Sequence, residues 1–352
     1  MISVLIVEDS PVQREALAYI LNSAPDIEVI GYASNGEEAV EASKQYQPKV
    51  ITMDIHMPGM DGFETTRRIM RESPTRIVIV SASWQSTEVE KSFQAMQAGA
   101  LAIIEKPPGL GHPDYERAAR ELVQIVRLMS EVQVIRRRAQ RPDDASTPLV
   151  SSQRHTPAQA TKKIKLVAIG ASTGGPPVLQ TILAGLPKNF AAPVLIVQHI
   201  GTGFAQGFVN WLTHATDFPV HLASAGDTLL PGHAYVAPDG FHTGLNAQGR
   251  ISLSKDAPEN HLRPSVSYSF RSVAQICGGE VVGVLLTGMG KDGAEELKLL
   301  RELGAITIAQ DEESSVVFGM PGEAVKLEAA QYVLSPNEII ALLCELIGKT
   351  TV

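Results

Sequence analysis

Cysteine, long apolar runs and positive charge are all scarce in this chain of 352 residues. Its two cysteines, Cys277 and Cys344, are too few for a disulfide framework and lack the spacing of metal ligands. No apolar run approaches the ~18 residues that a membrane-spanning helix requires. The net charge of −8 at pH 7 disfavours nucleic-acid binding and docking on an anionic membrane. Because the first residues also lack the basic region of a signal peptide, we expect a cytoplasmic protein with no nucleic-acid partner and no membrane insertion.

The composition is otherwise that of a globular protein, with 44% hydrophobic and 19% charged residues. In the first half, β-branched runs alternate with amphipathic segments. This alternation predicts a flavodoxin-like α/β domain, with a five-stranded parallel sheet covered by helices on both faces. Ser10 is the expected N-cap of the first helix, and Gln13 would complete a capping box. The expected strands are 4–7, 29–33, 50–54, 77–82 and 101–106, and the expected helices are 10–23, 36–46, 62–71, 87–98 and 114–138.

Periodicity stops between residues 139 and 163, where proline, serine, threonine and charged residues predict a flexible linker. The pattern resumes near residue 165. It predicts a Rossmann-like, doubly wound α/β domain with a small antiparallel insertion around a hairpin at 246–249. The expected strands there are 165–171, 193–199, 220–223, 233–237, 281–287 and 305–309. The expected helices are one that starts near 176, and 204–214, 266–277, 292–303, 323–329 and 336–347. The predicted units are a first domain at 1–125, a helix extension and linker at 126–163, and a second domain at 164–347.

Polar side chains end four of the five strands predicted for the first domain. Glu8 and Asp9 end the first strand, Asp54 the third, Ser81 the fourth and Lys106 the fifth. Because parallel strands bring their carboxyl ends to one rim, the three carboxylates would converge and hold a divalent cation such as Mg²⁺. The cation would orient a phosphoryl donor for attack by one carboxylate, while Ser81 and Lys106 contact the phosphoryl oxygens. Any one of these residues could be ordinary loop polarity, but five at five expected positions favour a phosphorylation site.

Over about residues 1–125 the chain resembles the receiver domain of response regulators. The resemblance implies Asp54 as the phosphoacceptor. It also implies that Glu8 and Asp9 form the metal pair, with the backbone carbonyl of His56 as a further ligand. The matching motifs are Val7-Glu8-Asp9-Ser10, Met53-Asp54-Ile55-His56-Met57-Pro58-Gly59, Val80-Ser81-Ala82 and Glu105-Lys106-Pro107.

One position departs from the receiver pattern. The family usually carries an aromatic switch residue three positions before the lysine, and this chain has Ile103 there. A side chain that swaps between inward and outward aromatic rotamers is therefore absent. We expect the signal to pass through other surfaces of the domain.

The second domain opens with a glycine-rich turn, Gly170-Ala171-Ser172-Thr173-Gly174-Gly175, between a predicted strand and a helix. As Gly-x-Ser-x-Gly, the turn has the form of a nucleophile elbow that exposes the Ser172 hydroxyl. As a glycine-rich turn before a helix, it could equally hold a phosphate. Ser172 occupies the place of the second glycine of a dinucleotide-binding fingerprint, which weakens the nucleotide interpretation.

A nucleophilic serine needs a base and a group that orients the base. His199 ends the next predicted strand, and Asp292 follows another. Taken singly, His199 could be a hydrogen-bonded core histidine and Asp292 a helix N-cap. Their joint occurrence with Ser172, each just beyond an apolar strand, favours a catalytic triad. The chain order Ser, His, Asp differs from that of α/β-hydrolases, in which the acid precedes the histidine.

Over about residues 164–347 the chain resembles the catalytic domain of chemotaxis protein-glutamate methylesterases, the CheB family. The matching motifs include Ile169-Gly170-Ala171-Ser172-Thr173-Gly174-Gly175-Pro176, Leu262-Arg263-Pro264-Ser265-Val266 and Leu286-Thr287-Gly288-Met289-Gly290-Lys291-Asp292-Gly293. The resemblance implies Ser172 as nucleophile, His199 as general base and Asp292 as the orienting acid. It places Thr173 and Met289 in the lining of the active site.

The implied activity is phosphorylation-regulated hydrolysis of glutamyl methyl esters on chemoreceptor cytoplasmic domains, with deamidation of receptor glutamines as a second reaction. The implied phosphodonor is a chemotaxis histidine kinase. The esterase reaction would need no cofactor. A second interpretation is a phosphorylation-controlled binding module in which Ser172 is a turn residue. A DNA-binding output is disfavoured, since the only basic run is short. We interpret the remaining histidines as linker, turn or surface residues: His155, His221, His233, His242 and His261.

Overall fold

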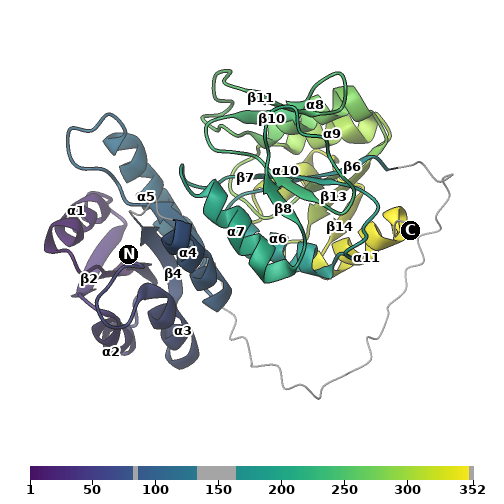
Figure 1. The fold of residues 1–352 in the computed structure, drawn as a ribbon. Helices are drawn as coiled ribbons and strands as arrows, with labels where there is room; N and C mark the ends of the chain where they lie inside the picture. Colours follow the sequence, from purple (N-terminus) through teal and green to yellow (C-terminus); the bar gives the residue numbers. More distant parts are fainter. Residues whose placement is uncertain (82–85, 133–163, 349–352) are drawn as a thin grey trace, which may run out of the picture.

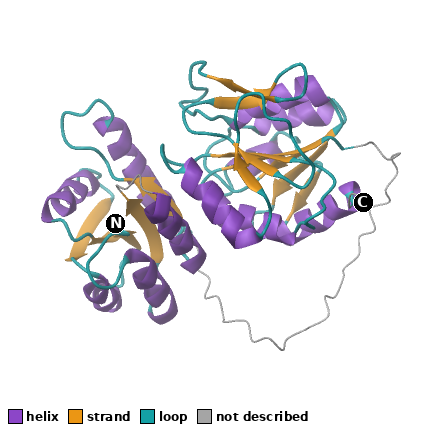
Figure 2. Cartoon of the chain, in the orientation of Figure 1, coloured by secondary structure: helices purple, strands orange, loops and turns teal. Residues whose placement is uncertain are grey.

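The chain forms two α/β units, which lie side by side in Figure 1 and are coloured by secondary structure in Figure 2. The computed structural model describes residues 1–81, 86–132 and 164–348, and it describes the side chains of 92–98 but not of 86–91. None of the helices in these ranges is both long and apolar enough to cross a membrane.

The first unit contains a parallel sheet in the order β2-β1-β3-β4-β5, which confirms the flavodoxin-like prediction. Helices α1 and α5 cover one face of the sheet, and α2, α3 and α4 cover the other. Its strands are β1 (Ile2–Val7), β2 (Ile27–Ala33), β3 (Val50–Met53), β4 (Arg76–Ser81) and β5 (Ala102–Glu105), and its helices are α1 (Pro11–Asn22), α2 (Gly36–Tyr46), α3 (Gly62–Glu72), α4 (Ser86–Ala98) and α5 (Tyr115–Glu131).

Side-chain caps begin helices α1, α2 and α3 of the first unit. Ser10 caps α1 by accepting a hydrogen bond from the Gln13 backbone N–H, as predicted. The Ser10 N–H, however, donates to Glu8 Oε1 at 3.2 Å, a role that the predicted capping box gave to the Gln13 side chain. Helix α5 ends at Glu131, because Val132 has an extended backbone (ψ 134°). The rest of the predicted helix, residues 133–138, lies outside the described residues, as do the predicted linker at 139–163 and His155.

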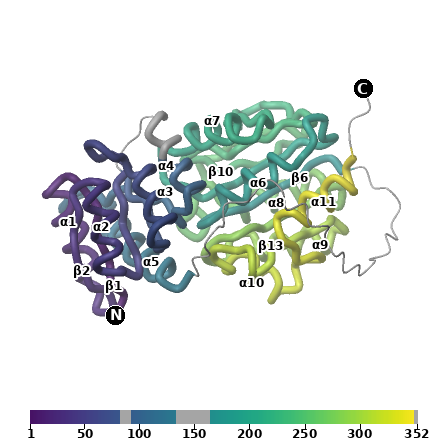
Figure 3. The backbone as a smooth tube through the Cα atoms, turned by 90° about the horizontal axis from the view of Figure 1, so that it is seen from below, coloured from purple at the N-terminus to yellow at the C-terminus, as the bar shows by residue number. Residues whose placement is uncertain are grey.

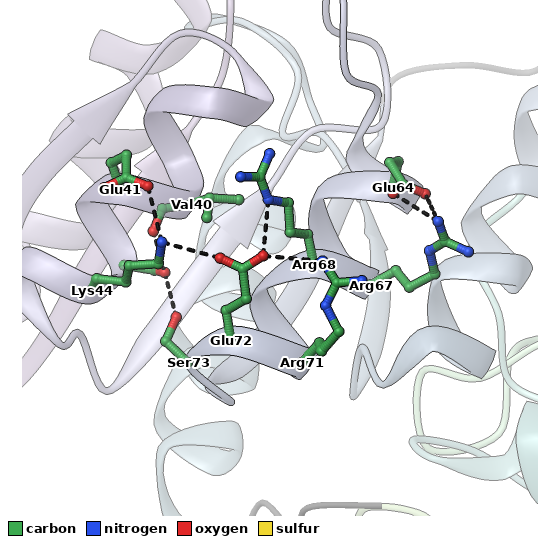
Figure 4. A network of polar contacts seen from close by, with 10 residues as sticks. Val40, Glu41, Lys44, Glu64, Arg67, Arg68, Arg71, Glu72 and Ser73 are labelled. Carbon is green, nitrogen blue, oxygen red and sulfur yellow. Dashed lines mark hydrogen bonds and ion pairs between the residues drawn. The ribbon is translucent and has the colours of Figure 1, made fainter. Parts of the chain in front are cut away.

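Charged side chains link α2 to α3 on the surface of the first unit (Figure 4). The Glu72 carboxylate receives Lys44 from α2 at 3.0 Å, and Arg68 and Arg71 from its own helix at 3.0 and 3.1 Å. Hydrogen bonds from Lys44, Arg71 and Arg68 lower the pKa of Glu72 to about 2. The contribution of this network to stability is present above the ordinary pKa of a glutamate and is lost as the pH falls through about 2.

The second unit contains a parallel sheet in the order β14-β13-β12-β6-β7-β9-β8 and a separate antiparallel hairpin of β10 and β11. Helices α6, α7 and α11 cover one face of the large sheet, and α8, α9 and α10 cover the other. Its strands are β6 (Leu166–Ala171), β7 (Val194–Gln198), β8 (Val220–Leu222), β9 (Ala234–Val236), β10 (His242–Leu245), β11 (Ile251–Ser254), β12 (Val281–Leu285), β13 (Ile306–Gln310) and β14 (Tyr332–Leu334), and its helices are α6 (Gly175–Gly185), α7 (Ala205–Thr216), α8 (Val266–Cys277), α9 (Ala294–Glu302), α10 (Met320–Lys326) and α11 (Pro336–Ile347).

The doubly wound fold and the hairpin agree with the sequence analysis, which did not anticipate β14. One histidine was assigned wrongly. His242 was expected at the surface, but it is 0% exposed in β10, stacks on Tyr268 and bonds the Ala257 carbonyl oxygen at 3.1 Å. The sequence does not signal this burial, because β10 has only four residues and all four are buried, so no alternation of polar and apolar residues marks the strand.

The two units touch through α4 of the first and α7 of the second, which lie next to each other in Figures 1 and 3. Phe93 of α4 is 1% exposed and belongs to the apolar core of the second unit. Its ring centroid lies 5.0 Å from that of Phe208 and 5.3 Å from that of Trp211, both on α7. A first-unit side chain is thus buried in the second unit's core.

Candidate active site

The serine turn is held at the carboxyl end of β6, the central strand of the large sheet. Ser172 directly follows the last residue of β6, and its backbone N–H donates to the Thr287 carbonyl oxygen at 3.0 Å. Gly174 ends the turn with a φ of 80°, a left-handed conformation that favours glycine, and α6 begins at the next residue. The turn therefore fixes Ser172 between a buried strand and a helix N-terminus.

A second glycine makes room for the serine. A Cβ atom at Gly288 would lie 2.7 Å from Ser172 Cβ and 2.4 Å from the Met320 sulfur. Gly288 follows β12, so the chain after β12 passes directly against the serine turn. Any larger residue there would displace Ser172.

His199 immediately follows β7, the neighbour of β6 in the sheet. The Gln198 side-chain amide donates to the carbonyl oxygens of Ser172 at 2.8 Å and of His199 at 2.9 Å. One buried amide thus ties the backbones of the serine and histidine segments together. The His199 side chain is 10% exposed, so it reaches the surface of the site.

The Asp292 carboxylate lies at the N-terminus of α8. In sequence, however, Asp292 comes just before α9. Its Oδ2 receives His199 Nε2 at 3.0 Å and the Val266 N–H at 2.6 Å. Its Oδ1 receives the Ser265 hydroxyl at 2.9 Å and the Ser267 N–H at 3.1 Å. Since α9 is capped by Gly293, the interpretation of Asp292 as its N-cap is wrong.

The electrostatics of this pocket keep Asp292 ionised. Burial by itself raises the pKa of the carboxyl, but His199 and the N–H groups of Val266 and Ser267 outweigh burial and lower it to about 2. The positive end of α8 acts in the same direction. Because an ionised carboxylate can only accept, Nε2 of His199 carries the proton in this pair, and Nδ1 is the basic nitrogen of the neutral ring.

Ser172, His199, Thr173 and Met289 all line one cavity of about 530 Å³. The Ser172 hydroxyl makes no hydrogen bond to His199, although both residues belong to the described chain; apo active sites often leave this contact open. The Thr173 N–H, at the start of the turn before α6, donates to no described group. Such an N–H can stabilise an oxyanion that develops beside Ser172.

Sequence reasoning missed the residues that hold the site together. Ser265 caps α8 and binds Asp292, and Thr287 Oγ1 donates to the Thr173 carbonyl oxygen at 3.0 Å. Gln310 Oε1 accepts the Thr287 N–H at 2.8 Å. The Ser265 signal was available, because a serine preceding a helical pattern predicts an N-cap. Nothing local predicts the other two contacts.

The strand ends of the first unit also meet as predicted. Glu8, Asp9 and Asp54 offer carboxylate oxygens that lie within 4.8 Å of one another. Lys106 Nζ lies 2.8 Å from Glu8 Oε2 and 2.9 Å from Asp54 Oδ2. The buried Glu8 Oε2 accepts no well-directed hydrogen bond from the described residues, so it has a lone pair to offer a cation. Three hard oxygen donors of this kind fit a divalent metal ion.

The remaining first-unit residues surround this cluster. The His56 backbone N–H donates to Asp54 Oδ1 at 3.2 Å, and the Lys106 N–H donates to the Ser81 carbonyl oxygen at 2.9 Å.

Burial raises the pKa of Glu8, and the nearby Asp54 charge adds to this rise. Burial lowers the pKa of Lys106, but its contacts with Glu8 and Asp54 outweigh burial and raise it.

Ile103 lies on β5, between the two units. It packs against the apolar core of each unit and lines the cavity that contains Ser172. The position that carries a rotating aromatic side chain in most receivers is therefore an interface position here.

Comparisons with known proteins agree on both units. A family model described as CheB methylesterase matches residues 167–343, and one described as response regulator receiver domain matches residues 4–112. The protein-glutamate methylesterase/protein-glutamine glutaminase 1 of Syntrophus aciditrophicus is 56% identical over 99% of both chains. The corresponding protein of Nitrosospira multiformis is 53% identical over 99% of this chain and 98% of its own. The crystal structure of the Thermotoga maritima CheB methylesterase catalytic domain is 40% identical and covers 52% of this chain and 99% of its own, with a TM-score of 0.51.

Proposed function

Because the chain belongs to the CheB methylesterase family and carries a response regulator receiver domain, we propose that it is a protein-glutamate methylesterase/protein-glutamine glutaminase of chemotactic adaptation. Its substrates are glutamyl methyl esters on the cytoplasmic domains of chemoreceptors, and receptor glutamines that it deamidates. One observation carries the proposal most directly. His199 lines the same cavity as Ser172, and behind it lies Asp292, whose carboxylate is held ionised at a helix N-terminus.

The reaction is a two-step acyl transfer. Ser172 Oγ attacks the ester carbonyl carbon, and His199 Nδ1 takes the hydroxyl proton as the tetrahedral intermediate forms. The Thr173 N–H, together with the Met289 segment on the opposite side of the turn, stabilises the oxyanion. His199 then gives the proton to the leaving methoxy group, and methanol departs. A water molecule repeats the sequence on the acyl-serine and releases the glutamate side chain.

Asp292 acts on the histidine and not on the substrate. Its carboxylate fixes the tautomer with the proton on Nε2, and it stabilises the imidazolium that forms in each step. The Ser265 hydroxyl and the N–H groups of Val266 and Ser267 hold the carboxylate in place. The imidazole therefore presents the same unprotonated nitrogen to Ser172 before every turnover.

We infer that the receiver domain is phosphorylated at Asp54 by a chemotaxis histidine kinase. Glu8, Asp9, Asp54 and the His56 backbone carbonyl would hold Mg²⁺, which neutralises charge on the incoming phosphoryl group. Lys106, already in contact with Asp54, would pair with a phosphoryl oxygen, and the Ser81 hydroxyl would bond another. The esterase reaction itself requires no cofactor.

The cavity supplies a physical basis for regulation. Its wall is built by both units, with Ile103, Glu105 and Gln124 from the receiver across from Ser172 and His199. In this position the receiver would obstruct the approach of a receptor segment to Ser172. We propose that phosphorylation of Asp54 weakens this contact and opens the site. We further propose a cytoplasmic protein with a receiver domain at 1–125, a connecting segment at 126–163 and a catalytic domain at 164–347.

The decisive experiment measures the release of labelled methanol from methylated receptor by the full chain, with and without acetyl phosphate and Mg²⁺. We expect turnover that depends on Ser172 and that rises with the phosphodonor. The matched control is Ser224→Ala, which changes an exposed serine outside the cavity. Methanol release that persists in Ser172→Ala, or a wild type that binds methylated receptor without hydrolysing it, would favour the binding-module interpretation instead.

A further inference from the structure

The wall that the catalytic domain contributes to the active-site cavity carries an arginine and no carboxylate in the part of the chain that the structure describes. Among the described residues of this domain that line the cavity, none is an aspartate or glutamate, whereas Arg263, His199 and His261 are present. The chain as a whole carries a net charge of −8, so the absence of carboxylates from this wall is not a general feature of its surface. Arg263 is its one permanent charge.

Only part of the Arg263 guanidinium is occupied. Nη1 donates to the backbone carbonyl oxygens of Lys255 and Asp256, each at 3.1 Å. Nε is buried and has no hydrogen-bond partner among the described residues. No described carboxylate forms an ion pair with this arginine, although the ion pairs of the domain include several on other cations. The Nε–Nη2 edge, which matches a carboxylate with two parallel hydrogen bonds, is therefore left over.

The loop that carries Arg263 is held firmly. Glu259 and Leu262 pair with each other through both backbone hydrogen bonds, at 3.1 and 2.8 Å. The turn between them places Asn260 and His261 at φ values of 50° and 67°, as a tight hairpin turn requires. Arg271 of α8 bonds Glu259 and also Glu296 of α9, and this ties the loop to the helical layer. The guanidinium is thus positioned before substrate arrives.

We propose that Arg263 forms a carboxylate-binding subsite, which recognises a second, unmodified acidic side chain of the receptor next to the methyl ester. This inference rests on the proposed function, since it concerns the substrate of the same cavity. A bidentate carboxylate on the Nε–Nη2 edge satisfies the buried Nε and places the neighbouring ester over the serine turn. The enzyme would therefore prefer esters that lie within acidic stretches.

The receiver domain already places acidic side chains in this cavity. Glu105 and Glu121 line the receiver side of the wall, and a Cβ atom at Gly201, two residues after His199, would lie 3.9 Å from Glu105 Cβ. Burial raises the pKa of Glu105. Neither of these two described carboxylates forms an ion pair with Arg263, and Glu121 instead lies 3.5 Å from Arg117, which also lines the receiver side of the cavity. The receiver therefore leaves the carboxylate-binding edge of Arg263 unpaired.

The test compares two methylated receptor fragments that differ only at the residues next to the ester, which are glutamate in one and alanine in the other. Alanine is used because glutamine is itself a substrate. Full-length wild type, Arg263→Gln, Arg263→Lys and the control Arg250→Gln are assayed for methanol release with acetyl phosphate and Mg²⁺. Arg250 is an exposed arginine outside the cavity, so its replacement makes the same charge change.

We expect wild type and Arg250→Gln to favour the glutamate fragment by about tenfold or more in kcat/KM, and this preference to shrink as salt is added. Arg263→Gln should lose the preference through a rise in KM of about tenfold on the glutamate fragment, with kcat and the alanine fragment unchanged within about twofold. Arg263→Lys should retain part of the preference for the glutamate fragment, because an ammonium group supplies the positive charge but not the two parallel N–H donors of a guanidinium.

Three results would overturn the subsite: wild type without a preference, equal slowing of both fragments by Arg263→Gln, or equal acceleration of both, which would make Arg263 a docking residue for the receiver. Binding of the two fragments to Ser172→Ala, measured by calorimetry, keeps the test independent of turnover. If wild type hydrolyses neither fragment yet Ser172→Ala binds the glutamate fragment about tenfold more tightly, the subsite stands and the proposed activity fails.

Discussion

Replacement of Asp292 by asparagine tests the catalytic geometry and the stability of the site in one variant. The carboxylate accepts from His199, Ser265, Val266 and Ser267, with two donors on each oxygen. Asparagine keeps one acceptor oxygen and turns the other position into a donor. One buried backbone N–H then faces an NH₂ group, or His199 must shift its proton to Nδ1 and lose the ability to accept from Ser172.

The hydrogen bonds of Asp292 indicate how much folding free energy and how much catalytic rate the variant should lose. An unpaired buried donor costs about 1–3 kcal/mol of folding free energy, so we expect Asp292→Asn to be folded but about 2 kcal/mol less stable at pH 7. The wrong tautomer, by analogy with serine proteases, costs about 10⁴-fold in kcat. The pH dependence follows from linkage. The pKa of Asp292 is lowered from 3.8 to about 2 on folding. Ionised Asp292 therefore contributes about 2 kcal/mol above pH ~4, and this contribution is lost as the pH falls through about 2.

The assay combines methanol release with urea denaturation, followed by fluorescence of the buried Trp211, at pH values between 7 and 3. The stability gap between wild type and Asp292→Asn should be constant from pH 7 to 5 and should narrow below pH 4. Activity within a few-fold of wild type would remove Asp292 from the mechanism. A gap that does not narrow in acid would show that the carboxylate is not the source of the stabilisation.

Three further predictions concern the nucleophile and the receiver. Ser172→Ala should lower kcat by about 10⁶-fold without changing the denaturation midpoint; near-normal turnover would refute a serine nucleophile. Asp54→Ala should leave basal methanol release intact and abolish stimulation by acetyl phosphate, so stimulation that survives would place the phosphoacceptor elsewhere. Phe93→Ala removes a receiver ring from the catalytic core, where large-to-small changes cost about 3–5 kcal/mol, and should raise basal turnover at least tenfold. If basal turnover of Phe93→Ala is unchanged while circular dichroism shows that both domains are folded, the Phe93 contact does not keep the receiver over the active site.

Much of the fold could be predicted because its signals are local. Helix α8 at Val266–Cys277 and helix α11 at Pro336–Ile347 have the predicted bounds, since caps and apolar periodicity act within a few residues. The parallel sheets follow from the alternation of strands and helices. The same topology brings the strand-end residues together, which is why the sequence alone suffices to group Glu8, Asp54 and Lys106.

Contacts between segments far apart in sequence were decided only by the tertiary structure. The sequence indicates that Asp292 follows a strand, but not that its carboxylate binds the first turn of α8. It shows an arginine at 263 without showing that Nε is buried and unpartnered among the described residues. Phe93 occupies an ordinary apolar position of a helix, and its pattern would suit the core of its own domain equally well. Periodicity reports which face of a segment is apolar; the partner that covers that face depends on how the whole chain packs.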